Sequence, residues 1–323
     1  MRRDVPSNAR NGAKRVAGAS ALAAMLVSGL MTAATAPALA TDAENLPTAD
    51  PQDITKTPAV VACSVRYPLV SDLTPALAAR DAKRAIRDGF DSHKNWGTKK
   101  NVEILRPDTS DIGEPALRVK YPEGTSSPSD NGKGGAGFYS ALEMPAGTDR
   151  ACLRYKVRFP KDFDFVKGGK LPGLFGGKAP SGGDKVDGKD GFSMRLMWRE
   201  DGKGELYEYI ANKGEKTDYG LSVGRGLWTF PTGRWVTIEQ EVILNDPDRA
   251  DGIVRLWVDG KPILEQDDIA YRTASDESIS GLMFSTFFGG SGKDWRTPQD
   301  QYVDFGDFRL YAPSGSHSAD RQG

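Results

Sequence analysis

Apolar and polar residues alternate in short runs through most of the chain after about residue 96. In the run 152–159, Leu153, Tyr155 and Val157 alternate with basic residues. Residues two apart on a β-strand point to the same side, so this pattern predicts a half-buried antiparallel strand. About ten such runs, in a chain with 37 glycines, predict an all-β fold. We expect a single-domain β-jelly roll, a concanavalin-like sandwich of antiparallel sheets.

The strands can be placed along the chain from their boundaries. Short runs that end at Gly, Pro, Asp or Ser predict further strands over residues 102–105, 116–121, 137–142, 192–199, 236–244, 253–258, 263–266, 281–288 and 302–311. The dipeptides Asp201-Gly202 and Asp259-Gly260 predict tight turns, each joining two neighbouring strands.

One helix is predicted, over residues 75–88. Thr74 is the expected N-cap, Pro75 suits the first helical position, and Gly89 is the expected stop. This helix lies ahead of the β-rich region, so we assign residues 63–95 to an N-terminal extension and residues 96–312 to the β-jelly-roll domain.

The first forty residues are typical of a secretory signal peptide. Five basic residues are followed by an apolar run from about 16 to 31, and Ala-Pro-Ala-Leu-Ala at 36–40 suits cleavage. A membrane anchor is the alternative, but Ser and Gly interrupt the apolar run. We therefore expect a signal peptide at 1–40, a disordered linker at 41–62, a disordered tail at 313–323, and a secreted protein without stable membrane association.

The charge balance argues against nucleic acid as a partner. The whole chain has a formal net charge of −1, and residues 1–40 contribute five basic residues and one acid, so the remainder carries −5. A mildly acidic protein lacks the general electrostatic attraction for nucleic acid.

Cysteine and histidine are both scarce. Cys63 and Cys152 are the two cysteines, and a disulfide between them is favoured over two buried thiols in an exported protein. Their spacing does not suit zinc, and we expect no metal or cofactor. His93 and His317 are the two histidines, so a histidine-centred catalytic site is nearly excluded. Any general base must be Tyr, Lys, Asp or Glu.

Five polar residues form a distinctive cluster between residues 161 and 210. Strand parity places Ser193 with Arg195 on one face, and Tyr207 with Tyr209 on one face of the next strand. Lys170 precedes them in a glycine-rich stretch. Residues 161–199 contain eight basic and five acidic residues, a local excess that favours a polyanionic substrate.

These motifs resemble polysaccharide lyase family 14. The resemblance rests on Lys-Leu-Pro-Gly-Leu at 170–174, Ser-x-Arg at 193–195 and Tyr-x-Tyr at 207–209, and extends over roughly residues 96–311. It implies a β-jelly roll that cleaves alginate or glucuronan by β-elimination. It also implies that Lys170, Ser193, Arg195, Tyr207 and Tyr209 are the catalytic residues.

β-Elimination on a uronate needs a neutralised carboxylate, a base for the C5 proton and an acid for the O4 leaving group. Arg195 suits the carboxylate because its guanidinium can donate two parallel hydrogen bonds, with Ser193 donating a third. We expect Tyr207 or Tyr209 to act as base and then acid, with its pKa lowered by nearby cations. Lys170 would assist by lowering that pKa or by helping the leaving group.

Several features leave alternatives open. Phe287 and Trp295 could stack on sugar rings or pack in the core. Residues 184–191 predict a flexible loop over a substrate groove, since the spacing of a calcium-binding EF-hand is absent. The alternative functions are a lectin-like binding protein and a glycoside hydrolase; we expect a monomer that binds an acidic polysaccharide.

Glu205 and Glu208 are the carboxylates that a hydrolase would need. Residues three apart on a strand face opposite sides, so this pair cannot flank one bond unaided. Glu208 is expected on the core side, either near a sheet edge or paired with a buried cation.

Overall fold

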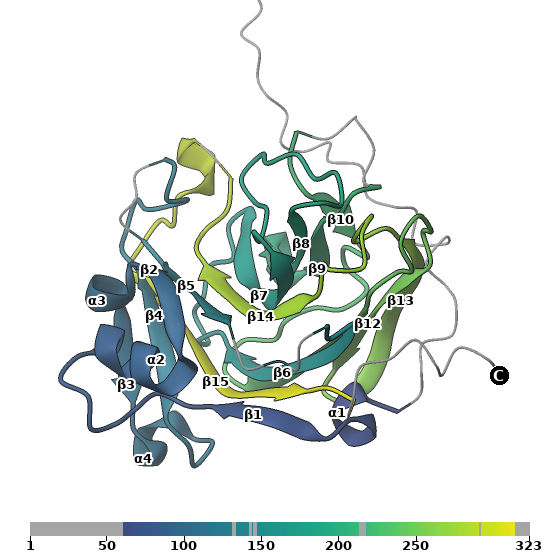
Figure 1. Ribbon diagram of the computed structural model, residues 1–323. Helices are drawn as coiled ribbons and strands as arrows, with labels where there is room; N and C mark the ends of the chain where they lie inside the picture. Colours follow the sequence, from purple (N-terminus) through teal and green to yellow (C-terminus); the bar gives the residue numbers. More distant parts are fainter. Residues whose placement is uncertain are drawn as a thin grey trace, which may run out of the picture. The chain divides into compact units, whose positions relative to one another are not determined.

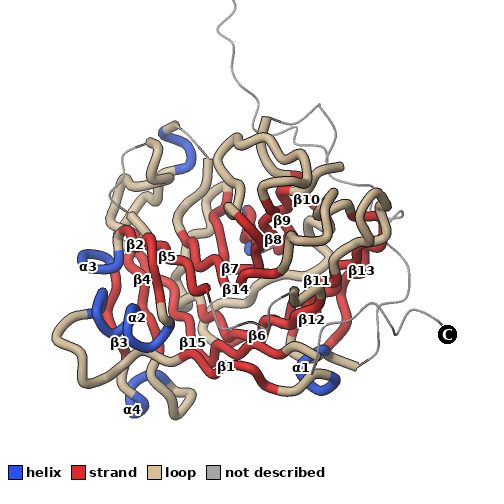
Figure 2. The backbone as a smooth tube through the Cα atoms, in the orientation of Figure 1, coloured by secondary structure: helices blue, strands red, loops and turns tan. Residues whose placement is uncertain are grey.

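The computed structural model describes residues 61–130, 134–141, 144, 147–212, 218–290 and 292–313. Within this part, two antiparallel sheets face each other in a sandwich, as the alternating runs predict (Figure 1). Figure 2 shows that strands dominate, with helix confined to short segments. The predicted signal peptide, and most of the predicted linker and tail, lie outside the described residues.

The first sheet has eight strands and its inner face forms one wall of the core. The strands are β1 (Leu69–Leu73), β3 (Val102–Leu105), β4 (Ala116–Tyr121), β6 (Arg150–Arg158), β11 (Trp235–Ile243), β12 (Gly252–Val258), β13 (Lys261–Ile269) and β15 (Gln301–Tyr311). Their order is β13-β12-β11-β6-β15-β4-β3, with β1 pairing with β15. The Asp259-Gly260 turn joins β12 to β13, which confirms that predicted hairpin.

The second sheet has seven strands and carries the predicted site. They are β2 (Ser92–Trp96), β5 (Ala136–Ala141), β7 (Gly168–Gly177), β8 (Gly191–Arg199), β9 (Gly204–Tyr209), β10 (Leu221–Val223) and β14 (Ile279–Thr286). Their order is β10-β9-β8-β7-β14-β5-β2. The predicted turn at Asp201-Gly202 is confirmed as the 3-10 segment Glu200–Gly202 between β8 and β9.

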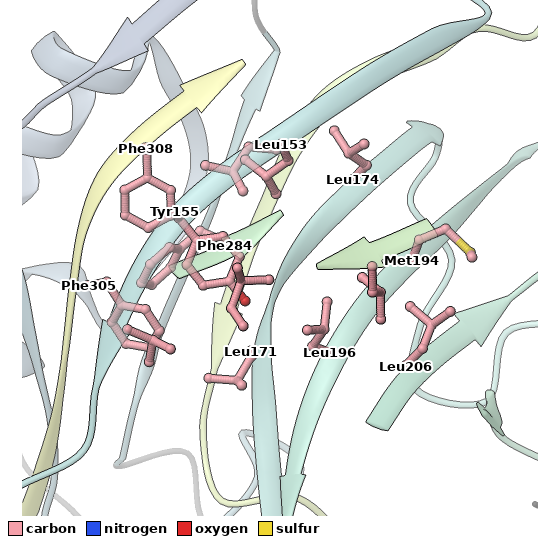
Figure 3. Packing of buried hydrophobic residues seen from close by; sticks show 14 of the residues in the cluster. Leu153, Tyr155, Leu171, Leu174, Met194, Leu196, Leu206, Phe284, Phe305 and Phe308 are labelled. Atoms are coloured by element: carbon pink, nitrogen blue, oxygen red, sulfur yellow. The ribbon is translucent and has the colours of Figure 1, made fainter. Parts of the chain in front are cut away.

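The core lies between the two sheets. Strand β6 shows how the alternation works, because Leu153, Tyr155 and Val157 are fully buried while the basic residues between them are half-buried. Figure 3 shows these side chains meeting leucines of the second sheet and aromatic rings of β14 and β15. The labelled residues from the facing sheet are Leu171, Leu174, Met194, Leu196, Leu206 and Phe284, and those from β15, beside β6 in the same sheet, are Phe305 and Phe308.

The predicted helix over 75–88 is wrong at both ends. Helix α2 spans Ala82–Phe90, and Asp81 caps it by accepting a hydrogen bond from the Arg84 amide at 2.9 Å. Gly89 lies inside the helix and does not stop it. A Cβ at Gly89 would lie 1.8 Å from the Thr74 carbonyl oxygen, so the glycine lets the preceding turn pack against the helix. The chain turns at Asp91, which adopts a left-handed conformation.

Residues 63–95 are part of the sandwich. Strand β1 pairs with β15 and strand β2 pairs with β5, so this segment adds a strand to each sheet. The predicted Cys63–Cys152 disulfide is present and joins α1 (Cys63–Arg66) to β6. Two more single-turn helices, α3 (Thr98–Asn101) and α4 (Pro107–Ser110), flank β3. No helix within the described ranges is long and apolar enough to cross a membrane.

Candidate active site

Strands β7, β8 and β9 bring all five predicted catalytic residues to one face of the second sheet. Ser193 lies opposite Tyr209, and Arg195 lies opposite Tyr207, in the β8–β9 register. Lys170 lies opposite Met197 in the β7–β8 register. Directly opposed residues share a face, so the side chains meet on the face turned away from the core.

A bulge in β7 explains the Lys-Leu-Pro-Gly-Leu motif. Leu171 pairs with Leu196 and Leu174 with Met194, so β7 contains one extra residue at this point. Pro172 lacks an amide hydrogen and suits a position without a ladder hydrogen bond. Gly173 is required because a Cβ there would lie 1.9 Å from the Met194 carbonyl oxygen. The bulge keeps both leucines on the core side and leaves Lys170 on the site face.

Four of the five side chains, those of Lys170, Arg195, Tyr207 and Tyr209, lie close together. The Lys170 Nζ lies 3.3 Å from the centroid of the Tyr207 ring, and donates to the Met197 Sδ at 2.7 Å. The Arg195 guanidinium lies 5.7 Å from the Tyr207 ring and 5.8 Å from the Tyr209 ring. The two phenol rings are 5.7 Å apart in an edge-to-face arrangement.

Burial sets the protonation of the cluster. Lys170 is 8% exposed, and this burial, with the charges of Arg195 and Arg199, lowers its pKa well below the usual value. Burial also raises the pKa of Tyr207, and Arg195 only partly opposes that shift. The expectation of a lowered phenol pKa is therefore wrong for Tyr207. The arrangement favours a neutral amine beside a protonated phenol.

An ion-pair cluster borders Lys170 on the same face. Glu205 is fully buried and pairs with Arg199 at 2.7 Å and Arg225 at 2.6 Å. Burial alone would raise the pKa of Glu205, but the two arginines hold it below its ordinary value. Glu205 is thus an ionised structural partner. Neither arginine was predicted from the sequence, although Arg199 is four residues after Arg195 and so shares its face.

Glu208 points into the core, as its parity predicts, and its strand β9 lies next to the edge strand β10, which agrees with the near-edge explanation. It is fully buried, and among the described residues neither carboxyl oxygen has a hydrogen-bond partner, so the predicted pairing with a buried cation is wrong. Burial, together with the charge of Asp268, raises the pKa of Glu208 to about 8. The side chain is therefore a neutral acid at neutral pH. A hydrolase pair with Glu205 is excluded by the opposite directions of the two side chains.

Residues 178–190, called here the cover segment, lie over the cluster. The Ser193 Oγ donates to the Pro180 carbonyl oxygen at 2.6 Å, and the Gly183 amide donates to the Tyr209 Oη at 3.3 Å. Val186 packs against the cluster formed by Met197, Tyr207 and Tyr209. The predicted loop over the site is therefore present, and none of the five residues is more than 8% exposed.

The two aromatic residues predicted to bind substrate flank this cluster. The Phe287 carbonyl oxygen accepts a hydrogen bond from the Lys170 amide at 2.9 Å, and the half-buried Phe287 ring meets Trp96 edge-on. Trp295 is 8% exposed and lies 5.9 Å from the Arg199 guanidinium. Both residues therefore border the site, and their role in sugar binding stays a prediction.

Metal-ligand groupings are scarce in the described residues. The one cluster found there is Cys63, Cys152 and Glu239, and the disulfide uses both sulfurs.

Comparison with known proteins identifies the family. Residues 109–308 match the family model described as Polysaccharide lyase 14. The crystal structure of the alginate lyase from Aplysia kurodai is 33% identical, with a TM-score of 0.67, and the match covers 76% of this chain and all of that one. The match to exolysin from Paramecium bursaria Chlorella virus 1 is 25% identical over 189 residues, and covers 49% of this chain and only 29% of exolysin.

A second similar structure contains a bound sugar. It is an alginate lyase mutant in complex with alginate tetrasaccharide, 21% identical with a TM-score of 0.64, and the match covers 78% of this chain and all of that one. At this identity the likeness supports the fold alone. The family match, the Aplysia likeness and the two-sheet sandwich together show that the chain belongs to polysaccharide lyase family 14.

Proposed function

We propose that the protein is a secreted polysaccharide lyase that cleaves a polyuronate, alginate or glucuronan, by β-elimination. The observation that carries this proposal is the buried contact between Lys170, Arg195 and Tyr207 on one face of the second sheet. It combines a cation for the uronate carboxylate, an amine whose pKa is lowered and a phenol whose pKa is raised.

Arg195 binds and neutralises the carboxylate at C5. Its guanidinium is 3% exposed and its Nε has no hydrogen-bond partner among the described residues, so donors remain for a ligand. Ser193 adds a hydroxyl from the same face once its bond to Pro180 is released. Neutralising the carboxylate makes the C5 proton more acidic and stabilises the enolate-like anion.

Lys170 and Tyr207 divide the proton transfers. A general base must be unprotonated, so the lowered pKa of Lys170 suits the group that takes the C5 proton. A general acid must be protonated, so the raised pKa of Tyr207 suits the group that gives a proton to O4. The C5–H and C4–O4 bonds break while a C4–C5 double bond forms. This assignment moves the role of base from tyrosine to Lys170, and leaves Tyr209 to orient the sugar.

The cover segment must be displaced before a polymer can reach these groups. The hydrogen bond from the Gly183 amide to the Tyr209 Oη would then break. Amide hydrogen exchange, measured in the inactive Tyr207→Phe variant with a uronate oligosaccharide, should show a changed rate at Gly183. An unchanged rate with saturating oligosaccharide would refute displacement of the segment.

The activity is tested by the ultraviolet absorbance of the unsaturated product. Wild-type protein should raise the absorbance of alginate or glucuronan solutions, whereas Lys170→Ala and Tyr207→Phe should lose at least about a hundredfold in rate. The matched control is Tyr302→Phe, a half-buried tyrosine on β15 of the other sheet that stacks on Arg118, and it should keep full activity. Binding of both polymers without any unsaturated product would favour the lectin-like alternative, and saturated reducing ends would favour a hydrolase.

Secretion and a monomeric state are part of the proposal. The signal-like residues 1–40 and the Cys63–Cys152 disulfide both suit export. The intact mass of exported protein should correspond to a chain that begins near residue 41, and light scattering should give the mass of one chain. Retention of residues 1–40 in exported protein would contradict the predicted cleavage.

A further inference from the structure

The face that carries the five residues continues across the sheet to its far edge. Tyr207 and Arg195 are opposed on β9 and β8, and beyond the β7 bulge the row continues through Met283 on β14, Tyr139 on β5 and His93 on β2. Directly opposed residues share a face. Tyr139 and His93 therefore lie on the same side of the sheet as the catalytic cluster.

Lys94, next to His93, has an unusual backbone conformation. Its φ is 49°, in the left-handed region that costs a non-glycine residue free energy. It lies within a break in the β2–β5 register between His93 and Trp96. Two hydrogen bonds between Asn95 and Ser92 support this turn of the strand. A strained residue held in place by its neighbours within a strand is an observation that points to function.

The strained conformation places a free cation on an aromatic ring. The Lys94 Nζ lies 5.4 Å from the centroid of the Tyr139 ring, and the His93 imidazole lies 5.9 Å from that ring at an interplanar angle of 31°. Lys94 and His93 are exposed, and Tyr139 is half-buried. Within the described part of the chain, Lys94 has no acidic partner within ion-pair distance. Its charge is therefore available to a ligand.

Tyr139 connects this cation to the catalytic cluster. Its ring packs edge-on against Phe175, which lies opposite Ser193 on the site face. The charge of Arg195 also acts on the Tyr139 phenol, where it opposes the rise in pKa caused by burial. Two cations, Arg195 and Lys94, thus lie on one continuous face with an aromatic side chain between them.

We propose that His93, Lys94 and Tyr139 form a second uronate-binding subsite, in which Lys94 binds a carboxylate of the polymer several sugars away from the bond that is cleaved. The proposal rests on the proposed function, because it takes the same acidic polymer as the ligand. Four strand spacings separate β8 from β2, which is about 19 Å at about 4.8 Å per strand. A polymer can contact both ends of this distance, and a disaccharide cannot.

Steady-state kinetics with Lys94→Ala test the subsite. The variant should raise KM for the polyuronate polymer about fivefold, the effect of losing one solvent-exposed charge contact. The kcat on the polymer and all kinetics on an unsaturated trisaccharide or shorter product should stay unchanged, because the catalytic cluster is intact. The difference in KM should disappear at about 1 M salt, where charges are screened within about 3 Å.

Lys100→Ala is the matched control, since Lys100 is an exposed lysine in α3 and lies outside this face. It should leave KM unchanged. Equal KM values for wild type, Lys94→Ala and Lys100→Ala on the polymer would overturn the subsite while leaving the lyase function in place. If no polyuronate is cleaved, titration calorimetry with the same polymers tests the subsite independently of the lyase function. Weaker binding by Lys94→Ala than by Lys100→Ala would support the subsite, and equal binding would refute it.

Discussion

Replacing Glu208 with glutamine should change how the stability of the fold depends on pH. Glu208 is fully buried behind the candidate site, and within the part of the chain that the structure describes its carboxyl oxygens have no hydrogen-bond partner. Gln266 lies near enough to influence the carboxyl group, and its Oε1 also lacks a partner. Burial penalises the charged carboxylate, and Gln266 only partly opposes the resulting rise in the pKa of Glu208, so the folded state holds the protonated form.

The size of the effect follows from the pKa of Glu208, which rises from 4.5 to about 8 on folding. Below pH 4.5 both states are protonated and the carboxyl group adds no pH dependence. Between pH 4.5 and about 8 the unfolded state loses the proton and the folded state keeps it. The free energy of unfolding then falls by about 1.4 kcal/mol per pH unit, to a total of roughly 5 kcal/mol. Above about pH 8 no further loss is expected.

Urea unfolding at several pH values measures this effect. Wild type should lose about 3 kcal/mol more stability than Glu208→Gln between pH 5 and pH 7.5, because glutamine does not titrate. Subtracting the unfolding free energy of Glu208→Gln from that of wild type at each pH removes the contribution of groups that titrate alike in both proteins. The control is Glu123→Gln at an exposed position, which should follow the wild-type curve. Parallel curves for wild type and Glu208→Gln would show that Glu208 is ionised in the folded protein, and would refute this argument.

Three other predictions test the site and the fold. Gly173→Ala should cost roughly 2 kcal/mol in thermal or urea unfolding, since its Cβ would lie 1.9 Å from a backbone oxygen, and wild-type stability would contradict the close approach of β7 to β8. Replacing both Cys63 and Cys152 with alanine opens a loop of 89 residues and should lower the unfolding free energy by about 4 kcal/mol; an unchanged midpoint in urea would count against a stabilising bridge. The kcat/KM should rise with pH as Lys170, whose pKa is lowered, loses its proton. It should not fall near pH 10, because the pKa of Tyr207 is raised. A fall in kcat/KM in the neutral range would contradict the assignment of Lys170 as base and Tyr207 as acid.

Strand parity was enough to predict much of the site. Because side chains two apart share a face, Ser193 with Arg195, and Tyr207 with Tyr209, could be grouped from the sequence alone. The hairpin turn at Asp201-Gly202 then placed the two pairs on neighbouring strands, as the β8–β9 register confirms. These predictions succeeded because they depend on local geometry, which a strand imposes whatever surrounds it.

Features that depend on tertiary contacts could not be predicted in this way. The bulge that puts Lys170 on the site face is defined by the neighbouring strand, which no local pattern reveals. The predicted helix end failed for a similar reason, because Gly89 lies inside α2 and serves a contact with the Thr74 backbone. Lys94 gives no sequence signal for its left-handed backbone, since lysine at an exposed position is ordinary.

The cover segment affects both the protonation of the site and the access of a polymer to it, because it buries the site. The lowered pKa of Lys170 depends first on exclusion of water, and residues 178–190 cover the Met197, Tyr207 and Tyr209 cluster that Lys170 contacts. Moving the segment to admit a polymer would hydrate the amine and let its pKa rise toward the usual value. The polymer must therefore replace the segment closely enough to exclude water again, since otherwise Lys170 would take a proton from solvent before it could take one from C5. A long substrate held at both Arg195 and Lys94 meets that requirement better than a short one, because a second contact reduces the time that the site stays open to water.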